Sequence, residues 1–216
     1  MSGFALTLLA LNPLALLLPL AVLTAAFAFV RVQRDEPLDL ASGITAYLAI
    51  LLATSAVLFA VGLGFVLTAL IAGIDEGFAY GLPDAFGPAG IVTFDERQNG
   101  DLGRGIGLAM VGTLLAMLHV AARARAVNAG VFDHGLEAAV EALAAIGTAL
   151  VAFVALGVGL GAAFERAFVD DSSASPGGEL AFGVAFAVVW FIYSARVLIR
   201  IGWWPGETHA GAIAEE

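Results

Sequence analysis

The sequence contains neither cysteine nor lysine, and both absences restrict its chemistry. A chain without cysteine forms no disulfide, thiolate metal site or iron–sulfur cluster, and it has no cysteine nucleophile. Retinal and pyridoxal Schiff bases require an amine side chain, so the absence of lysine excludes both. A phosphate-binding loop that ends in Gly-Lys is excluded for the same reason.

Charge is also scarce: only 13% of the residues are charged, 61% are hydrophobic and the mean hydropathy is +0.96. These values lie far from those of a water-soluble domain, so we predict a single membrane domain. Nineteen acidic residues against nine basic ones give a net charge of -10, which argues against nucleic acid as a partner. Acidic, lysine-free composition is typical of halophilic archaea, where excess carboxylates keep proteins apart in concentrated salt. A GC-rich bacterium with arginine-biased codons is the alternative.

Five apolar runs are each long enough to cross about 30 Å of hydrocarbon. They cover residues 4–30, 44–74, 105–122, 138–164 and 180–202. The first run lacks the positive residues that precede a signal-peptide core, so we expect it to be retained as an anchor. The sequence therefore predicts an all-α integral membrane protein with about five transmembrane helices.

The predicted organisation is an N-terminal anchor followed by two helical hairpins. Residues 1–34 form the N-terminal transmembrane helix. Residues 40–125 form the first hairpin, with an acidic outer loop at 75–104. Residues 137–204 form the second hairpin, and residues 205–216 form a cytoplasmic tail.

The arginines predict how the helices are oriented in the cell membrane. Six of them fall on one side of the predicted bundle: Arg31, Arg34, Arg123, Arg125, Arg196 and Arg200. Three fall on the other side: Arg97, Arg104 and Arg166. By the positive-inside rule the six-arginine side is cytoplasmic, so this multi-pass protein has its N-terminus outside and its C-terminus inside.

A short motif suggests that the two hairpins, which enter the membrane in the same direction, are parallel repeats. The sequence Val-Gly-Leu-Gly at residues 61–64 recurs at residues 158–161. Each copy lies in the first helix of its hairpin, and each second helix ends in arginine. Repeats of this kind are related by a pseudo-twofold axis along the membrane normal.

Ionisable residues inside apolar runs are candidates for function. The predicted polar cluster consists of His119, Glu141 and Arg123, which meet at the inner mouth of the bundle. A hydrogen bond from His119 to a neighbouring helix is the structural alternative. Glu141 and Glu137 alternatively stabilise the start of their helix, where the helix dipole favours carboxylates. No second intramembrane histidine is available for haem, so we expect no cofactor and no metal.

Two further residue sets have predicted structural roles. Small residues on one helix face allow close packing in lipid, and the candidates are Gly62, Gly64, Gly103, Gly107, Gly157 and Gly161. Arginines near helix ends contact lipid phosphates by snorkelling, and the candidates are Arg31, Arg34, Arg196 and Arg200.

The outer loop at 75–104 combines carboxylates with aromatic residues. Its carboxylates either gather cations or form a solvated surface, and their spacing does not match an EF-hand. Four aromatic residues predict that the loop folds back on the bundle as a cap: Phe78, Tyr80, Phe86 and Phe94.

Two classes of function remain open. The chain has neither a Gly-x-Ser-x-Gly turn nor a His-Glu-x-x-His motif, so we do not expect an enzyme. The favoured interpretation is a non-catalytic polytopic protein, a structural or accessory subunit of a larger membrane assembly. Its partners are then the lipid bilayer together with other membrane subunits or further copies of itself. The alternative is a small channel or carrier for an ion or solute. Few polar groups lie near the predicted bilayer midplane, which disfavours this alternative.

Overall fold

The computed structural model describes residues 39–81, 93–169, 172, 174–200 and 202. These residues form helices and contain no strand. Four helices are long and apolar enough to cross a membrane, and a fifth is short. In chain order they are α3 (Leu40–Ala72), α4 (Glu76–Tyr80), α5 (Phe94–Asn128), α6 (His134–Phe168) and α7 (Pro176–Arg200). The prediction of an all-helical membrane domain is confirmed at this level.

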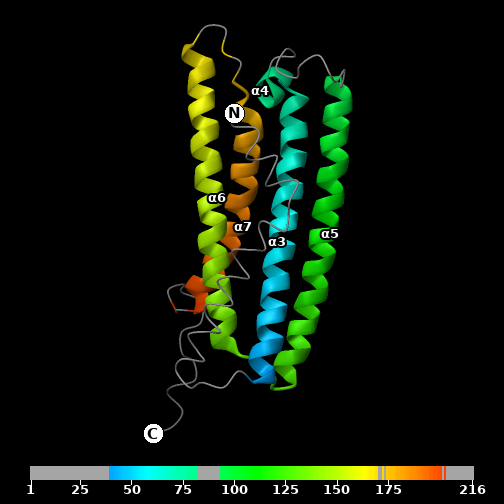
Figure 1. The fold of residues 1–216 in the computed structure, drawn as a ribbon, viewed down its shortest axis with the longest axis vertical. Helices are drawn as coiled ribbons and strands as arrows, with labels where there is room; N and C mark the ends of the chain where they lie inside the picture. The colour runs from blue at the N-terminus through cyan, green and yellow to red at the C-terminus, as the bar shows by residue number, and fades with distance from the viewer. Residues whose placement is uncertain (1–38, 82–92, 170–171, 173, 201, 203–216) are drawn as a thin grey trace.

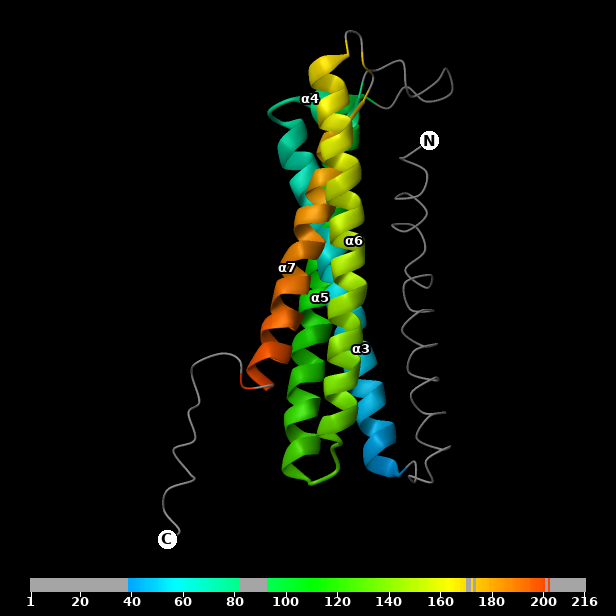
Figure 2. The same ribbon diagram turned by 90° about the vertical axis from the view of Figure 1, so that its left-hand side faces the viewer.

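The four long helices lie side by side with their axes along the length of the molecule (Figures 1 and 2). The order across the view is α6, α7, α3 and α5, so α3 and α7 are central and the other two lie outside. The main packed pairs are α3 with α5, α6 with α7, and α3 with α7. We call the end that carries Leu40 and Asn128 the lower end, as drawn in Figure 1, and the opposite end the upper end.

Side-chain caps explain where three of the long helices begin. Asp39 is the N-cap of α3, because its side chain accepts a hydrogen bond from the backbone N–H of Ser42 at 2.8 Å. Asp133 caps α6 in the same way, accepting from the backbone N–H of Leu136 at 3.0 Å. Each cap satisfies one of the amide groups that lack a partner in the first turn of a helix.

The start of α5 differs from the sequence prediction. Thr93 accepts from the Glu96 amide, and the Glu96 side chain accepts from the Thr93 amide, which together form a capping box. Helix α5 therefore begins at Phe94 rather than at residue 105. Residues 94–104, predicted as loop, form the first turns of this helix.

Replacing Thr93 by alanine tests this cap. The free energy of unfolding should fall by about 0.5–2 kcal/mol because the Glu96 amide loses its side-chain partner. Thermal unfolding in detergent measures the change. Thr113→Ala is a matched control, because the Thr113 hydroxyl bonds only to the Ala109 carbonyl of its own helix and lies on an exposed face. Equal losses in the two variants would contradict a capping role for Thr93.

The packed helix pairs meet where small residues let their backbones approach. An added Cβ at Gly62 of α3 would lie 2.6 Å from the backbone carbonyl oxygen of Gly105 in α5. One at Gly112 of α5 would lie 2.7 Å from the backbone carbonyl oxygen of Ser55 in α3. Ser55 and Gly62 are seven residues apart, as are Gly105 and Gly112. That spacing keeps small residues in one seam between two antiparallel helices.

The outer pair α6 and α7 uses a reciprocal arrangement. Gly159 of α6 lies against Leu180 of α7, and Gly183 of α7 lies against Leu156 of α6. Each glycine thus receives a leucine from the other helix. A Cβ at either glycine would lie under 3 Å from the facing leucine. The close packing of α6 against α7 therefore requires glycine at both positions.

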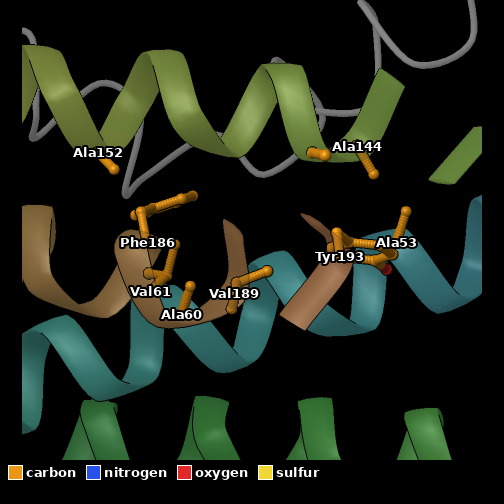
Figure 3. Close-up of a cluster of buried hydrophobic side chains, with 9 residues drawn as sticks. Ala53, Ala60, Val61, Ala144, Ala152, Phe186, Val189 and Tyr193 are labelled. Atoms are coloured by element: carbon orange, nitrogen blue, oxygen red, sulfur yellow. The ribbon is translucent and has the colours of Figure 1, made fainter. Parts of the chain in front are cut away.

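The main apolar core lies between α3, α6 and α7. Figure 3 shows Ala53, Ala60 and Val61 of α3 facing side chains of the other two helices. The labelled residues from those helices are Ala144, Ala152, Phe186, Val189 and Tyr193. Helix α5 contributes none of the buried residues in this cluster. It is joined to the bundle mainly through α3.

Two parts of the predicted architecture have a different outcome. The first predicted span, residues 4–30, lies outside the described residues, so the count of five spans stays a prediction.

The hairpin repeat predicts that α3 corresponds to α6 and α5 to α7. Under that symmetry the packed pair α3 and α7 would be matched by α6 and α5, which do not form a packed pair. The packing therefore does not follow the predicted twofold relation.

Candidate functional site

A cluster of charged side chains gathers at the lower end of the bundle, where three helices place their ends together. Its two carboxylates, Glu137 and Glu141, lie one turn apart in the first part of α6 and are only 2% and 3% exposed. The cations come from the other helices. We call this set the lower charge cluster, and it comprises Arg123, His134, Glu137, Glu141, Arg196 and Arg200.

The start of α6 is fixed in place by α3, and this positions both glutamates. The backbone N–H of Asp133 donates to the Thr45 hydroxyl at 2.8 Å, and the Ser42 hydroxyl donates to the Asp133 carboxylate at 3.3 Å. Thr45 and Ser42 are both buried. The loop between α5 and α6 is therefore tied to the first turns of α3, and the two carboxylates point into the bundle from a fixed base.

Glu137 is held by arginines from two other helices. Arg123 of α5 donates to both carboxylate oxygens, and its bond to Oε2 is 2.9 Å long. Arg200 of α7 donates to the same Oε2 at 2.5 Å. The His134 ring is 3.8 Å away and mostly exposed. Glu137 thus links the ends of α5, α6 and α7 through one buried carboxylate.

Glu141 is paired with α7 alone. Arg196 donates through Nε to Oε1 at 2.8 Å, and its Nη2 lies 2.5 Å from the same oxygen. The other oxygen, Oε2, lies 3.0 Å from Arg200 Nε but accepts no hydrogen bond from any described residue. The ion pair therefore compensates the charge of Glu141 while one lone-pair site of its carboxylate stays unfilled.

The cluster carries more positive than negative charge. Three arginines face two glutamates, so the sum is 3 − 2 = +1 when His134 is neutral. Buried ion pairs cost desolvation energy, and their attraction offsets this cost only where geometry and hydrogen bonding are good. The bidentate Arg123–Glu137 pair meets that requirement. Chemically, the cluster can fix the lower ends of three helices and can attract an anion.

The predicted cluster of His119, Glu141 and Arg123 and the observed cluster share only two members. Nδ1 of His119 lies 2.6 Å from the Leu115 carbonyl oxygen, one turn back in its own helix, and the ring contacts Tyr47. Among the described residues, His119 therefore forms a hydrogen bond neither with Glu141 nor with a neighbouring helix. Arg123 binds Glu137 rather than Glu141.

The predicted lipid-phosphate arginines also have a different environment from the expected one. Arg196 and Arg200 make ion pairs with Glu141 and Glu137, although both side chains keep some exposure. Arg31 and Arg34 lie outside the described residues. Sequence reasoning missed these pairs because the partners are 55 and 63 positions apart, and only the register of α6 against α7 brings them together.

The predicted packing glycines fall into two groups. Gly62 packs against α5, and Gly64 packs against the Phe182 ring of α7. The other four have no described atom within 4 Å of an added Cβ: Gly103, Gly107, Gly157 and Gly161. Two pairs of glycines with four-residue spacing thus point away from the described part of the bundle, one pair on each outer helix.

At the upper end, the short helix α4 folds back onto the bundle. Arg166 of α6 donates to the Gly77 carbonyl at 2.8 Å and lies 3.6 Å from Asp75. Gly177, near the start of α7, lies against the backbone of Phe78 and Ala79. The predicted cap is confirmed for Phe78 and Tyr80 of α4, whereas Phe94 is the first residue of α5 and Phe86 lies outside the described residues.

Tyr80 is the buried centre of this cap. Its hydroxyl donates to Asp101 of α5 at 3.1 Å, its ring stacks on Phe94, and the Arg97 guanidinium lies 4.4 Å from the ring centroid. Burial raises the pKa of Tyr80 above its usual range, and the neighbouring Asp101 carboxylate raises it further. The neutral hydroxyl is therefore the form that the folded cap favours.

Tyr80→Phe should destabilise the protein by about 1–3 kcal/mol, because Asp101 loses a buried donor. The raised pKa means that this contribution is complete below the unfolded-state tyrosine pKa of about 10 and is lost as pH rises through the higher folded-state value. Unfolding of both proteins near neutral pH and well above pH about 10 measures the effect. A difference that grows with pH would contradict the assignment.

The acidic and histidine side chains of the described residues bear on whether a metal site is present. Within the described ranges, no group of three or more His, Cys, Asp or Glu side chains is placed to hold a metal ion. Three carboxylates of the predicted outer loop cap helices or contact Tyr80 and Arg166: Asp75, Glu96 and Asp101. Comparisons of the chain with family models, with curated proteins and with solved structures found no match.

Proposed function

We propose that the protein is a non-catalytic subunit of a larger membrane assembly, with α5 as its main docking helix. The observation that carries this proposal is how little of α5 the bundle covers. Of its residues only four are buried, and these lie near its ends and along the α3 seam: Asp101, Gly105, Gly112 and Ala126. The rest of the α5 surface is not covered by the other described helices.

The residues on the exposed side of α5 favour contact with another protein over contact with lipid. Residues that recur every three or four positions share one face of α5, turned away from α3. They are Gly103, Gly107, Met110, Leu114 and Leu118, and the three large side chains are 59%, 57% and 66% exposed. Glycine in a helix interior costs about 1 kcal/mol relative to alanine. Contact with lipid does not offset this cost, whereas close packing against another helix does.

The polar groups of the spans support a structural role. The hydroxyls of four residues within the long helices bond to carbonyls three or four positions earlier in their own helix: Thr54, Ser55, Thr68 and Thr148. Such groups are satisfied locally and leave no donor directed at a solute. Together with the ion pairs of the lower charge cluster, which join α5, α6 and α7, this favours a rigid bundle over a transport pathway.

Purification of the tagged chain from its own membranes tests the proposal. Native mass spectrometry should show the chain in stoichiometric complex with a different polypeptide, and an absorption spectrum should show whether the complex carries a pigment. Gly107→Leu should abolish the complex without lowering the unfolding temperature, because no described atom surrounds Gly107. Gly43→Leu, which is equally unobstructed but lies on α3, is the control. A lone chain, or loss of stability in Gly107→Leu, would overturn the proposal.

A channel or carrier for a small ion or solute is the second candidate. The observation in its favour is Glu141, a buried carboxylate with one oxygen that accepts no hydrogen bond within the described structure. A transported cation or proton would supply the missing partner. Ion flux into liposomes that contain the purified protein would support this function if Glu141→Gln abolished the flux. Equal flux in wild-type protein and in empty liposomes excludes it.

The composition further suggests, as part of the proposal, a cell-membrane protein of a halophilic archaeon with the lower end in the cytoplasm. Of the seven arginines among the described residues, four lie at the lower ends of α5 and α7 and three lie toward the upper end, which agrees with the positive-inside rule. Accessibility of single introduced cysteines to a membrane-impermeant reagent tests this orientation, since the native chain contains no cysteine.

A further inference from the structure

A groove runs along the lower half of the bundle where α5 and α7 fail to meet. Both helices pack on α3, but they do not pack on each other, so α3 forms the floor and the other two form the walls. The cavity has a volume of about 570 Å³. Volumes of roughly 300–1,000 Å³ are usual for sites that bind small molecules.

The walls of the groove are apolar. Phe59 lies on the floor, Met117 and Ala121 lie on the α5 wall, and Val189 and Ile192 lie on the α7 wall. The polar atoms nearby are already bonded: the Ser55 hydroxyl donates to the Leu51 carbonyl at 2.6 Å, and the Thr113 hydroxyl donates to the Ala109 carbonyl at 2.8 Å. The groove is therefore suited to a hydrocarbon chain rather than to a polar solute.

Arg196 of the lower charge cluster lies one helical turn beyond Ile192, which lines the groove. Arg196 follows Ile192 by four residues and Val189 by seven, so all three share one face of α7. Its side chain is 38% exposed, and its contacts with the carboxylates use Nε and Nη2. The other terminal nitrogen, Nη1, makes no hydrogen bond within the described structure. A guanidinium has five N–H donors, so Arg196 can bind a second oxyanion without leaving Glu141.

We infer that the groove binds one membrane lipid with an anionic phosphate headgroup. One acyl chain occupies the groove between α5 and α7, and the phosphate diester accepts hydrogen bonds from Arg196. The excess positive charge of the lower charge cluster supplies the electrostatic complementarity, because one anion brings its sum from +1 to zero. None of the residues named for the docking face of α5 lines the groove, and this site does not depend on the proposed function.

The test uses the full-length protein reconstituted into vesicles of either phosphatidylglycerol or phosphatidylcholine, followed by detergent extraction and native mass spectrometry. One phosphatidylglycerol molecule should remain on each chain, and phosphatidylcholine should be retained at least tenfold less. Ala121→Trp fills the groove while it leaves every arginine in place, and it should lower phosphatidylglycerol retention at least tenfold. Ala167→Trp makes the same replacement on an exposed face of α6 and should leave retention unchanged.

Arg196→Gln tests the contribution of the lipid headgroup separately from that of the acyl chain. The variant should lose the preference for phosphatidylglycerol while it keeps weak retention of either lipid. If the variant does not fold, the comparison of Ala121→Trp with Ala167→Trp decides alone. Retention that is unaffected by Ala121→Trp, equal retention of both lipids by the wild-type protein, or displacement of the lipid by inorganic phosphate would each overturn the inference.

Discussion

Glu137→Gln should destabilise the protein by about 3–5 kcal/mol, the largest effect that we expect from any single side chain. The replacement keeps the volume but removes the charge that Arg123 and Arg200 share at the lower end. Three arginines would then face one carboxylate. Uncompensated charge in a partly buried site is costly, so the ends of α5 and α7 should separate from α6.

Thermal or denaturant unfolding of the purified protein measures this loss. Glu165→Gln is the matched control, because Glu165 lies near the other end of α6, is exposed, and binds only the Ser172 hydroxyl at 3.2 Å. The control should change stability by less than about 0.5 kcal/mol. Similar small effects of both replacements would show that the lower charge cluster does not hold the helices together.

Gly62→Ala should have the second largest effect, a destabilisation of about 1–3 kcal/mol. The added methyl group would meet the backbone of α5 at Gly105 and Ala109, and a backbone cannot rotate away as a side chain can. The two helices would have to separate along their whole seam. Since α5 is attached to the bundle mainly through α3, this change should loosen α5 more than the rest.

Gly107→Ala is the control for this prediction. Gly107 lies on the same helix pair, but no described atom lies within 4 Å of its added Cβ. This variant should be stabilised by about 0.5–1 kcal/mol, since alanine is the better helix former. Hydrogen exchange would locate the change, with faster exchange in α5 for Gly62→Ala only. Equal behaviour of the two variants would contradict the seam between Gly62 and Gly105.

The long apolar helices are predictable from the sequence because each depends on local composition. Runs of apolar residues predict α3 and α6, and Asp39 is a readable cap. The start of α5 was equally readable: Thr93 and Glu96 have the spacing of a capping box, but the charged residues that follow suggested a loop. A helix in the membrane can extend into water, so charge alone does not mark its end.

The helix contacts are less predictable because they depend on register. The four-residue glycine spacing singled out Gly103 and Gly107, which point outward, and missed Gly105 and Gly112, which form the seam with α3. A seven-residue spacing would have found the second pair. Likewise, the sequence does not indicate that Glu141 forms an ion pair with Arg196 rather than with His119, because the partner depends on which face of α7 packs against α6.

The most direct test of the proposed role is photocrosslinking in native membranes. A benzophenone side chain replaces Leu114, at the centre of the bare face of α5, and in a second variant it replaces Phe191, an exposed residue of α7. The account predicts that position 114 crosslinks to a different polypeptide, whereas position 191 yields lipid adducts. If position 114 yielded only lipid adducts or a second copy of this chain, the assignment as a subunit of a larger assembly would be wrong.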